Sequence, residues 1–405
     1  MNFVALLIFT AVSLTCNVNG HKLQQANVVS STPLPQLYPV TMNGKYGFID
    51  EAGNVKFWLP DDVYTIFGFS EGLAVVGRRV PDTYGRWGFV DHTGKIMIET
   101  KFNLAKSFSE GLAAVVTSEP KGAGGGKIGY IDQTGHMVIL PQFDPGGTVS
   151  DYPFSEGLAA VALLNRGWGY IDKAGKFVVE PRFDEAFPVS EGRALVGIRQ
   201  VSYSKMKYGF IDRQGQWIAE PQYESAGDFA EGLAPVVIGQ KLGFIDLQGQ
   251  IVIKPQFGPT GQCPDTGGVS ASRFSEGLAA VQVNWKWGFV DRSGQWVIKP
   301  TWACALSFSQ GLAMVGMRDR KGRLRYGYID KTGVPIIPPQ FSTARPFIGK
   351  LASVGVGGED DAALEAIEAY KAGKSDEDVE KLLERNQTKY GYIDRTGRFV
   401  WKPTN

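Results

Sequence analysis

The sequence has few of the side chains on which metal sites and nucleic-acid-binding surfaces depend. Only three histidines and three cysteines occur in 405 residues, and His21, His92 and His136 are scattered without a partner at ligand spacing, so neither a metal nor a cofactor is predicted. Lys and Arg (42) almost balance Asp and Glu (41), which leaves no positive field to gather nucleic acid. Nucleic acid is therefore not expected as a partner.

Catalytic fingerprints are also missing. The sequence has no nucleophile elbow, phosphate-binding loop or dinucleotide-binding motif between a strand and a helix. The glycine-rich stretch 122–126 joins two predicted strands and is interpreted as a long turn. We therefore predict no catalytic residues and expect a protein that is not an enzyme.

Long apolar runs are absent beyond the N-terminus. Residues 2–15 are uncharged and mostly apolar, which suits a secretory signal, but the run is shorter than the ~20 residues of a spanning helix. We expect a signal peptide at 1–20, a flexible leader at 21–37 and no transmembrane segment in the mature chain. The protein is then exported to the periplasm, the cell surface or the medium, with a lipid anchor at Cys16 as the alternative.

What the sequence does contain is one phrase, repeated nine times: an aromatic or apolar residue, Gly, an aromatic residue, Ile or Val, and Asp. Intervals of about 40 residues between most copies are typical of a repeat protein. The aspartates mark the copies: Asp50, Asp91, Asp132, Asp172, Asp212, Asp246, Asp291, Asp330 and Asp394.

Each copy predicts three strands, as in 278–283, 287–291 and 296–300. Alternating apolar residues predict the first strand, and the D-x-x-G that follows the second predicts a turn in which the carboxylate accepts a backbone N–H. A Phe-Ser-Glu-Gly-Leu phrase is interpreted as a linker. We predict an all-β array of nine stacked three-stranded antiparallel meanders over 38–403. Because nine exceeds the ~4 to 8 blades usual in propellers, an open or curved superhelical array is favoured over the alternative, a closed propeller-like ring.

One insertion interrupts the last repeat at 357–388. Helix-forming residues fill 362–372, and Ser375 precedes a second amphipathic stretch. A helical hairpin is therefore predicted there.

Two rows of side chains are candidates for binding. Trp87, Trp168 and Trp287 share one slot of the repeat and could stack on a sugar ring or a cation, although Ile128 and Leu242 in the same slot favour core packing. Six glutamates of the linker phrase are expected to cap backbone N–H groups, with an acidic binding stripe as the alternative: Glu71, Glu110, Glu156, Glu191, Glu231 and Glu276.

Cys263 and Cys304 lie in the linkers of consecutive repeats. Stacking would bring these linkers side by side, and a disulfide between the two is reasonable in an exported protein. Two free thiols are the alternative.

The combined phrase, K-W-G-F/Y-V/I-D-x-x-G followed by F-S-E-G-L-A-A-V, resembles the WG-repeat family of bacterial proteins over 38–403. The resemblance implies an exported β-repeat protein with no catalytic residues attached to the motif. We therefore expect a non-enzymatic scaffold that binds a protein or polysaccharide partner at the cell envelope. The alternatives are a structural surface protein without a discrete ligand and an enzyme with a site between repeats.

Overall fold

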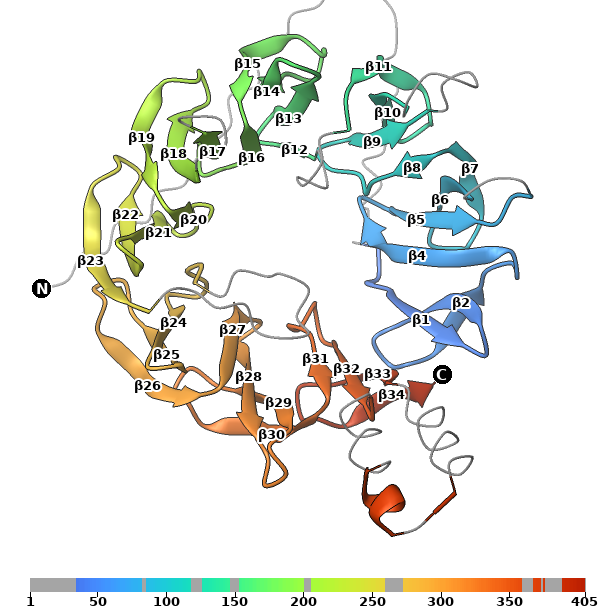
Figure 1. Cartoon of the computed structure of the whole chain (residues 1–405). Coiled ribbons are helices and arrows are strands. Elements are labelled where there is room, and N and C mark those ends of the chain that lie inside the picture. Colours follow the sequence, from blue (N-terminus) through green and yellow to red (C-terminus); the bar gives the residue numbers. More distant parts are fainter. Residues whose placement is uncertain are drawn as a thin grey trace, which may run out of the picture. The chain divides into compact units, whose positions relative to one another are not determined.

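Each repeat folds into one small antiparallel sheet, and the sheets stand side by side around a ring (Figure 1). The computed structural model describes residues 34–81, 85–117, 126–145, 153–199, 205–258, 272–358, 367–372, 374–375 and 388–404. The unit from Pro35 to Asn405 contains all nine sheets that these residues form. We call the sheets blades 1 to 9 in chain order, and the unit is a nine-bladed β-propeller.

The strands of each blade follow one another from the ring axis outward. Blades 1 to 3 contain β1 (Tyr38–Met42), β2 (Lys45–Ile49) and β3 (Val55–Trp58); β4 (Val63–Ser70), β5 (Leu73–Arg78), β6 (Arg86–Val90) and β7 (Ile96–Phe102); β8 (Leu104–Ala105), β9 (Leu112–Val116), β10 (Ile128–Asp132) and β11 (Met137–Phe143). Blades 4 to 6 contain β12 (Phe154–Ser155), β13 (Leu158–Leu163), β14 (Gly167–Ile171) and β15 (Phe177–Phe183); β16 (Glu185–Ser190), β17 (Arg193–Arg199), β18 (Met206–Asp212) and β19 (Trp217–Tyr223); β20 (Ser225–Ala226), β21 (Leu233–Ile238), β22 (Lys241–Asp246) and β23 (Ile251–Phe257). Blades 7 to 9 contain β24 (Ala279–Val283), β25 (Lys286–Val290) and β26 (Trp296–Trp302); β27 (Cys304–Ser309), β28 (Leu312–Arg318), β29 (Leu324–Ile329) and β30 (Pro335–Phe341); β31 (Thr343–Ala344), β32 (Ala352–Val356), β33 (Lys389–Ile393) and β34 (Phe399–Thr404).

The all-β repeat fold is confirmed, but most blades have one strand more than predicted. Seven of the nine described sheets have four strands. The extra strand is the innermost one, and it comes from the segment before Ser-Glu-Gly that we interpreted as a linker. It is only two residues long in several blades, such as β8 and β12, so it leaves almost no alternation in the sequence.

The turn chemistry is as predicted. In blade 4, Asp172 Oδ1 accepts the N–H groups of Ala174 and Lys176, both at 3.0 Å, and Gly175 takes φ = 79°. The same pair of hydrogen bonds recurs after all nine aspartates. These carboxylates are therefore used locally, to close the hairpin between the two outer strands.

The glycine of the repeated phrase is required by close backbone contact. A Cβ on Gly169 of β14 would lie 2.5 Å from the carbonyl oxygen of Val179 on β15, at a register shift between the two strands. The outer strand also continues two residues past Pro181 to Phe183, whereas the sequence predicted that it ends at the proline. Pro181 lies within the register shift between the pairs Trp168–Phe183 and Tyr170–Val179, and such a bulge tolerates a proline, which has no N–H to donate to the ladder.

The ring is closed, so the favoured open array is wrong and the alternative ring is confirmed. Blade 9 packs directly on blade 1: the Tyr38 hydroxyl donates to the carbonyl of Ile348 at 3.0 Å, and the Tyr392 hydroxyl donates to the carbonyl of Pro39 at 2.9 Å. Leu351 is buried with Tyr38 in one core cluster. An open array would leave an apolar face bare at each end, and closure buries both.

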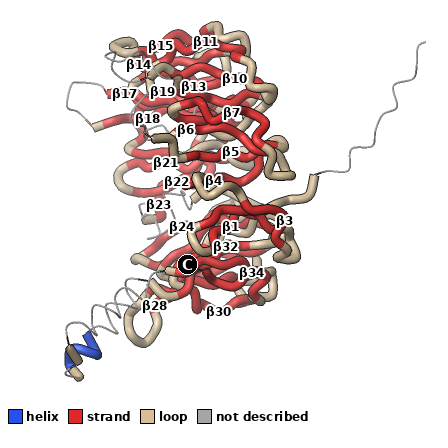
Figure 2. The backbone as a smooth tube through the Cα atoms, turned by 90° about the vertical axis from the view of Figure 1, so that its right-hand side faces the viewer, coloured by secondary structure: helices blue, strands red, loops and turns tan. Residues whose placement is uncertain are grey.

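The insertion is described only in part. Residues 367–371 are helical, and Glu368 Oε1 lies 3.1 Å from Lys321 Nζ of blade 8. Figure 2 shows this helical turn standing away from the strands. The second predicted helix, the signal peptide and most of the leader fall outside the described residues, although Leu37 at the end of the leader is buried. In the described part of the chain, no helix is long and apolar enough to cross a membrane.

Candidate functional site

The three tryptophans predicted as stacking candidates occupy equivalent places with different exposure. Each lies in the strand next to the outermost one of its blade and pairs across to an aromatic residue at the end of the outer strand. Trp168 (6% exposed) and Trp287 (2%) are buried within core clusters. Trp87 is only partly buried, and its ring centroid lies 5.9 Å from that of Phe67 and 6.0 Å from that of Tyr64.

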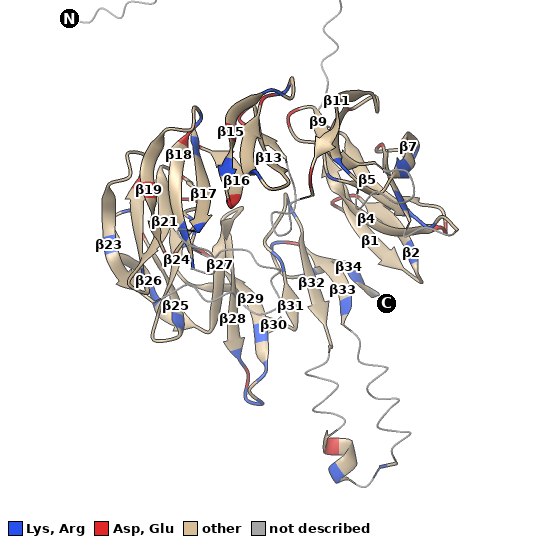
Figure 3. Cartoon of the chain, turned by 45° about the horizontal axis from the view of Figure 1, so that its top comes forward, with Lys and Arg blue, Asp and Glu red and all other residues tan. Residues whose placement is uncertain are grey.

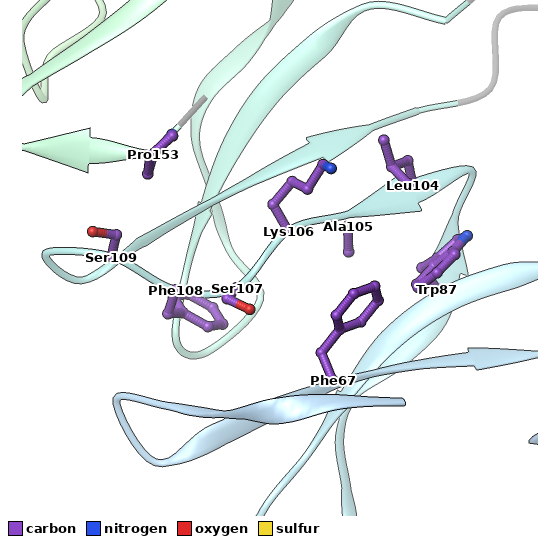
Figure 4. A pocket seen from close by; sticks show the side chains of 9 residues that line it. All are labelled: Phe67, Trp87, Leu104, Ala105, Lys106, Ser107, Phe108, Ser109 and Pro153. Atoms are coloured by element: carbon purple, nitrogen blue, oxygen red, sulfur yellow. The ribbon is translucent and has the colours of Figure 1, made fainter. Parts of the chain in front are cut away.

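Trp87 lines a pocket of about 300 Å³ where blade 2 meets blade 3 (Figure 4). We call it the Trp87 pocket; its lining residues are Phe67, Trp87, Leu104, Ala105, Lys106, Ser107, Phe108, Ser109 and Pro153. Phe67 comes from the innermost strand β4, Trp87 from β6, and the run 104–109 from the innermost edge of blade 3. Most of the pocket lining therefore comes from the innermost strands and strand ends of blades 2 and 3, and Trp87 comes from a strand farther out.

The lining combines apolar faces with a few polar groups. Phe67 is 49% exposed, so its ring is accessible at the pocket wall. Lys106 and the exposed Ser107 contribute an ammonium group and a hydroxyl, and burial raises the pKa of Tyr64 behind Trp87, so its phenol stays neutral. Such a site can stack on a flat ring and hydrogen-bond to its substituents.

A second pocket of about 480 Å³ lies where blade 7 meets blade 8. We call it the Trp285 pocket; its lining residues are Gln282, Trp285, Lys286, Trp287, Ala303, Met317 and Arg318. Trp287 takes the place here that Trp87 takes in the first pocket. Trp285 stands at the tip of the β24–β25 hairpin and is 82% exposed.

The row of glutamates holds neighbouring blades together. Each accepts the backbone N–H of a glycine in the next blade at 2.8–3.0 Å, from Glu71 with Gly111 to Glu276 with Gly311. The serine before the glutamate makes a parallel bond, as Ser109 Oγ does to the carbonyl of Phe154 at 2.7 Å. The glutamates thus cap backbone N–H groups, as expected, but those of the next blade.

Burial raises the pKa of Glu110, but the N–H of Gly157 and the ammonium of Lys173 outweigh it, so the net shift of this pKa is downward. The Lys173 Nζ lies 3.2 Å from Glu110 Oε2 and also donates to the Glu110 carbonyl at 2.9 Å. The ion pair between Glu110 and Lys173 therefore joins two neighbouring blades.

Within the described residues, no three His, Cys, Asp or Glu side chains come together as a metal site would require. His92 packs against Phe69 with ring centroids 3.9 Å apart, and its Nδ1 lies 3.2 Å from the carbonyl oxygen of Gly72.

Cys304 is buried at the start of β27 and is disulfide-bonded. Cys263, its predicted partner, lies outside the described residues, so the pairing stays a prediction.

Sequence reasoning missed Phe67 and Trp285. Phe67 lies in the segment that we interpreted as a linker, so its position on a strand facing the ring axis gave no signal. The sequence did contain a signal for Trp285. The first repeat has Asn43-Gly44 at its hairpin turn, whereas this repeat has Asn284-Trp285. A tryptophan in place of a turn glycine is unexpected.

The family model described as a WG containing repeat matches residues 87–118, 128–165, 168–199, 208–241, 243–258, 270–287, 287–320 and 326–359, which together make up more than half of the chain. None of the curated proteins matches the sequence.

Similar solved structures include a eukaryotic initiation factor, with 11% identity and a TM-score of 0.59 over 90% of this chain and 95% of that chain. They also include the computationally designed protein Ika8, with 12% identity and a TM-score of 0.41 over 80% and 96% of the two chains. BamB from Moraxella catarrhalis has 13% identity and a TM-score of 0.41 over 75% and 90%. At 11% identity, the first likeness shows the fold alone.

Proposed function

The chain belongs to the WG-repeat family, and from that premise we propose that it is a non-enzymatic propeller scaffold that binds a glycan in the Trp87 pocket. The observation that carries this proposal is the pair of accessible rings, Phe67 and Trp87, at the wall of a pocket of about 300 Å³. A pyranose ring offers C–H groups to an aromatic face and hydroxyls at its rim. Ser107 and Lys106 also line the pocket, and we propose that they hydrogen-bond to those hydroxyls.

The propeller fold supports a binding role because it offers a rigid frame. The pocket walls come from strands and strand ends, which position side chains more accurately than free loops do. Both walls are also held by the glutamate and serine bonds between blades 2 and 3. A rigid pocket loses little conformational freedom when a ligand binds.

Glycan-array screening of the purified protein, followed by calorimetric titration of the best neutral oligosaccharide, tests the proposal. Phe67→Ala and Trp87→Ala are expected to weaken binding by about tenfold or more, as truncation of a stacking aromatic does. Tyr390→Ala is the matched control, because Tyr390 has the same slot in blade 9, is 56% exposed and does not line the Trp87 pocket. Thermal unfolding of each variant checks its fold.

The absence of saturable glycan binding, or equal binding by Phe67→Ala, Trp87→Ala and the parent protein, would contradict the proposal. The bound oligosaccharide is also expected to keep its length on long incubation, since the site is proposed to be non-enzymatic. Shortened products that disappear in the Trp87→Ala variant would assign an enzyme instead.

We also propose that the protein works at the cell envelope after export. The apolar, uncharged residues 2–15 support this. N-terminal sequencing of the protein from fractionated native cells is expected to find a start near His21 outside the cytoplasm. An intact Met1 in the cytoplasmic fraction would contradict export.

A further inference from the structure

The hairpin tip at Trp285 combines an unfavourable backbone with an exposed indole. Asn284 and Trp285 have φ of 50° and 60°, the left-handed values that a tight two-residue hairpin turn needs at both central positions. Asn-Gly suits such a turn, and the first repeat has it at Asn43-Gly44 with φ of 52° and 74°. A bulky side chain is disfavoured there, and at 82% exposure the indole gains little packing in return.

The pocket beside this indole is positively charged. Lys286 and Arg318 are two of its lining residues, and no Asp or Glu is among them. Lys286 has no ion pair within the described residues. The one acid of the neighbouring hairpin, Asp319, is held by Arg323 Nε at 2.8 Å, so it does not neutralise the pocket. Figure 3 shows the predominance of basic residues on the β28–β29 hairpin.

We infer that the Trp285 pocket binds a carboxylate-bearing sugar of an acidic polysaccharide. The sugar ring stacks on the face of Trp285, and its carboxylate lies between the Lys286 ammonium and the Arg318 guanidinium. Gln282, a polar side chain that is 8% exposed, also lines the pocket wall. This site is separate from the Trp87 pocket, and two cationic side chains line it where Lys106 alone lines that pocket.

The shape of the site favours a sugar over an acidic peptide. The cavity of about 480 Å³ is bounded by the ends of two hairpins from adjacent blades, and its size suits one or two sugar rings. Peptides bind most often along a free strand edge or in an extended groove. An exposed indole face in a pocket that also carries two cations instead matches a sugar ring with one carboxylate.

Calorimetric titration of the purified protein with tetragalacturonate is the direct test. Tetragalacturonate is expected to bind, more weakly as salt is raised. Trp285→Gly is expected to weaken binding by about tenfold or more while the melting temperature stays equal or rises, because glycine suits the left-handed turn. A variant that loses binding without losing stability separates recognition from folding.

The role of the two cations is tested with Lys286→Ala and Arg318→Ala. Each is expected to weaken tetragalacturonate binding by about tenfold. Arg320→Ala is the matched control, because Arg320 is exposed on the same hairpin as Arg318 but does not line the pocket. Its affinity is expected to equal that of the parent protein. Phe67→Ala is also expected to leave tetragalacturonate binding unchanged, so failure at the Trp87 pocket and failure here are distinguishable.

Three results would overturn the inference. One is an absence of tetragalacturonate binding by the parent protein at millimolar concentration. A second is equal affinity of Trp285→Gly and the parent protein. A third is binding of polyglutamate with the same affinity and the same loss in Trp285→Gly, which would assign the pocket to acidic peptides.

Discussion

Replacing Glu110 by alanine should loosen the junction between blades 3 and 4. Glu110 Oε2 accepts the N–H of Gly157 at 2.9 Å and lies 3.2 Å from Lys173 Nζ. The residue has φ = 54°, a value that glutamate and alanine adopt with similar difficulty, so the substitution removes the side-chain contacts without changing the backbone cost.

The size of the effect follows from the exposure of the two groups. A hydrogen bond to a charged group contributes about 1.5–3 kcal/mol, and the 31% exposure of Glu110 places this one near the lower end. The ion pair with Lys173, which is 46% exposed, adds no more than about 0.5 kcal/mol. The expected loss of unfolding free energy is therefore about 2 kcal/mol.

Guanidinium unfolding followed by tryptophan fluorescence measures this loss. Glu110→Gln keeps an oxygen acceptor but no charge, and we expect it to lose about half as much as Glu110→Ala. Glu180→Ala is the control, since Glu180 is 70% exposed and pairs with the exposed Arg166 at 3.1 Å; its expected loss is below about 0.5 kcal/mol. Equal losses in Glu110→Ala and Glu180→Ala would refute the role of the glutamate row in holding the blades together.

Three further predictions concern the stability of the ring. Gly169→Ala would place a Cβ 2.5 Å from a backbone oxygen of the facing strand, whereas a Cβ on Gly68 would meet no atom within 4 Å. Chemical unfolding should therefore show that Gly169→Ala loses about 2 kcal/mol or more of unfolding free energy and that Gly68→Ala loses almost none. The pKa of Glu110 is lowered in the folded protein, so its contribution is complete above the unfolded pKa near 4.5 and is lost as the pH falls through the lower folded value; a melting temperature that is constant between pH 7 and 3 would contradict this. Peptide mapping without reduction should recover Cys263 linked to Cys304, and recovery of unlinked Cys263 would exclude the pairing.

The sequence was sufficient for the parts of the fold that depend on local chemistry. The nine D-x-x-G turns were predictable because each aspartate bonds to N–H groups two and four residues ahead, as Asp172 does. The fourth strand was not predictable because two residues, as in β12, show no alternation. Ring closure depends on the angle between neighbouring blades. Every side chain packed between the blades contributes to that angle, so it could not be predicted from the repeated phrase.

The candidate pockets were predictable only in part. The tryptophan slot was visible because it recurs, and it does place Trp87 and Trp287 at junctions between blades. The other aromatic residues of the two pockets, Phe67 and Trp285, do not recur from repeat to repeat. A comparison of the repeats therefore does not single them out. The partners of the glutamates lie in the next blade, more than 30 residues along the chain, and emerge only once the ring is formed.

The contact between the first and last blades gives the most direct test of the closed ring. Lys350 Nζ of blade 9 lies 2.6 Å from Glu51 Oε2 of blade 1, close enough for a zero-length carbodiimide to join the two as an amide. Mass spectrometry of the cross-linked monomer is expected to find the Glu51–Lys350 peptide pair, and Lys350→Arg should abolish it. Its absence from the monomer, with neighbouring blades still cross-linked at Glu110 and Lys173, would show an open array and contradict the closed propeller.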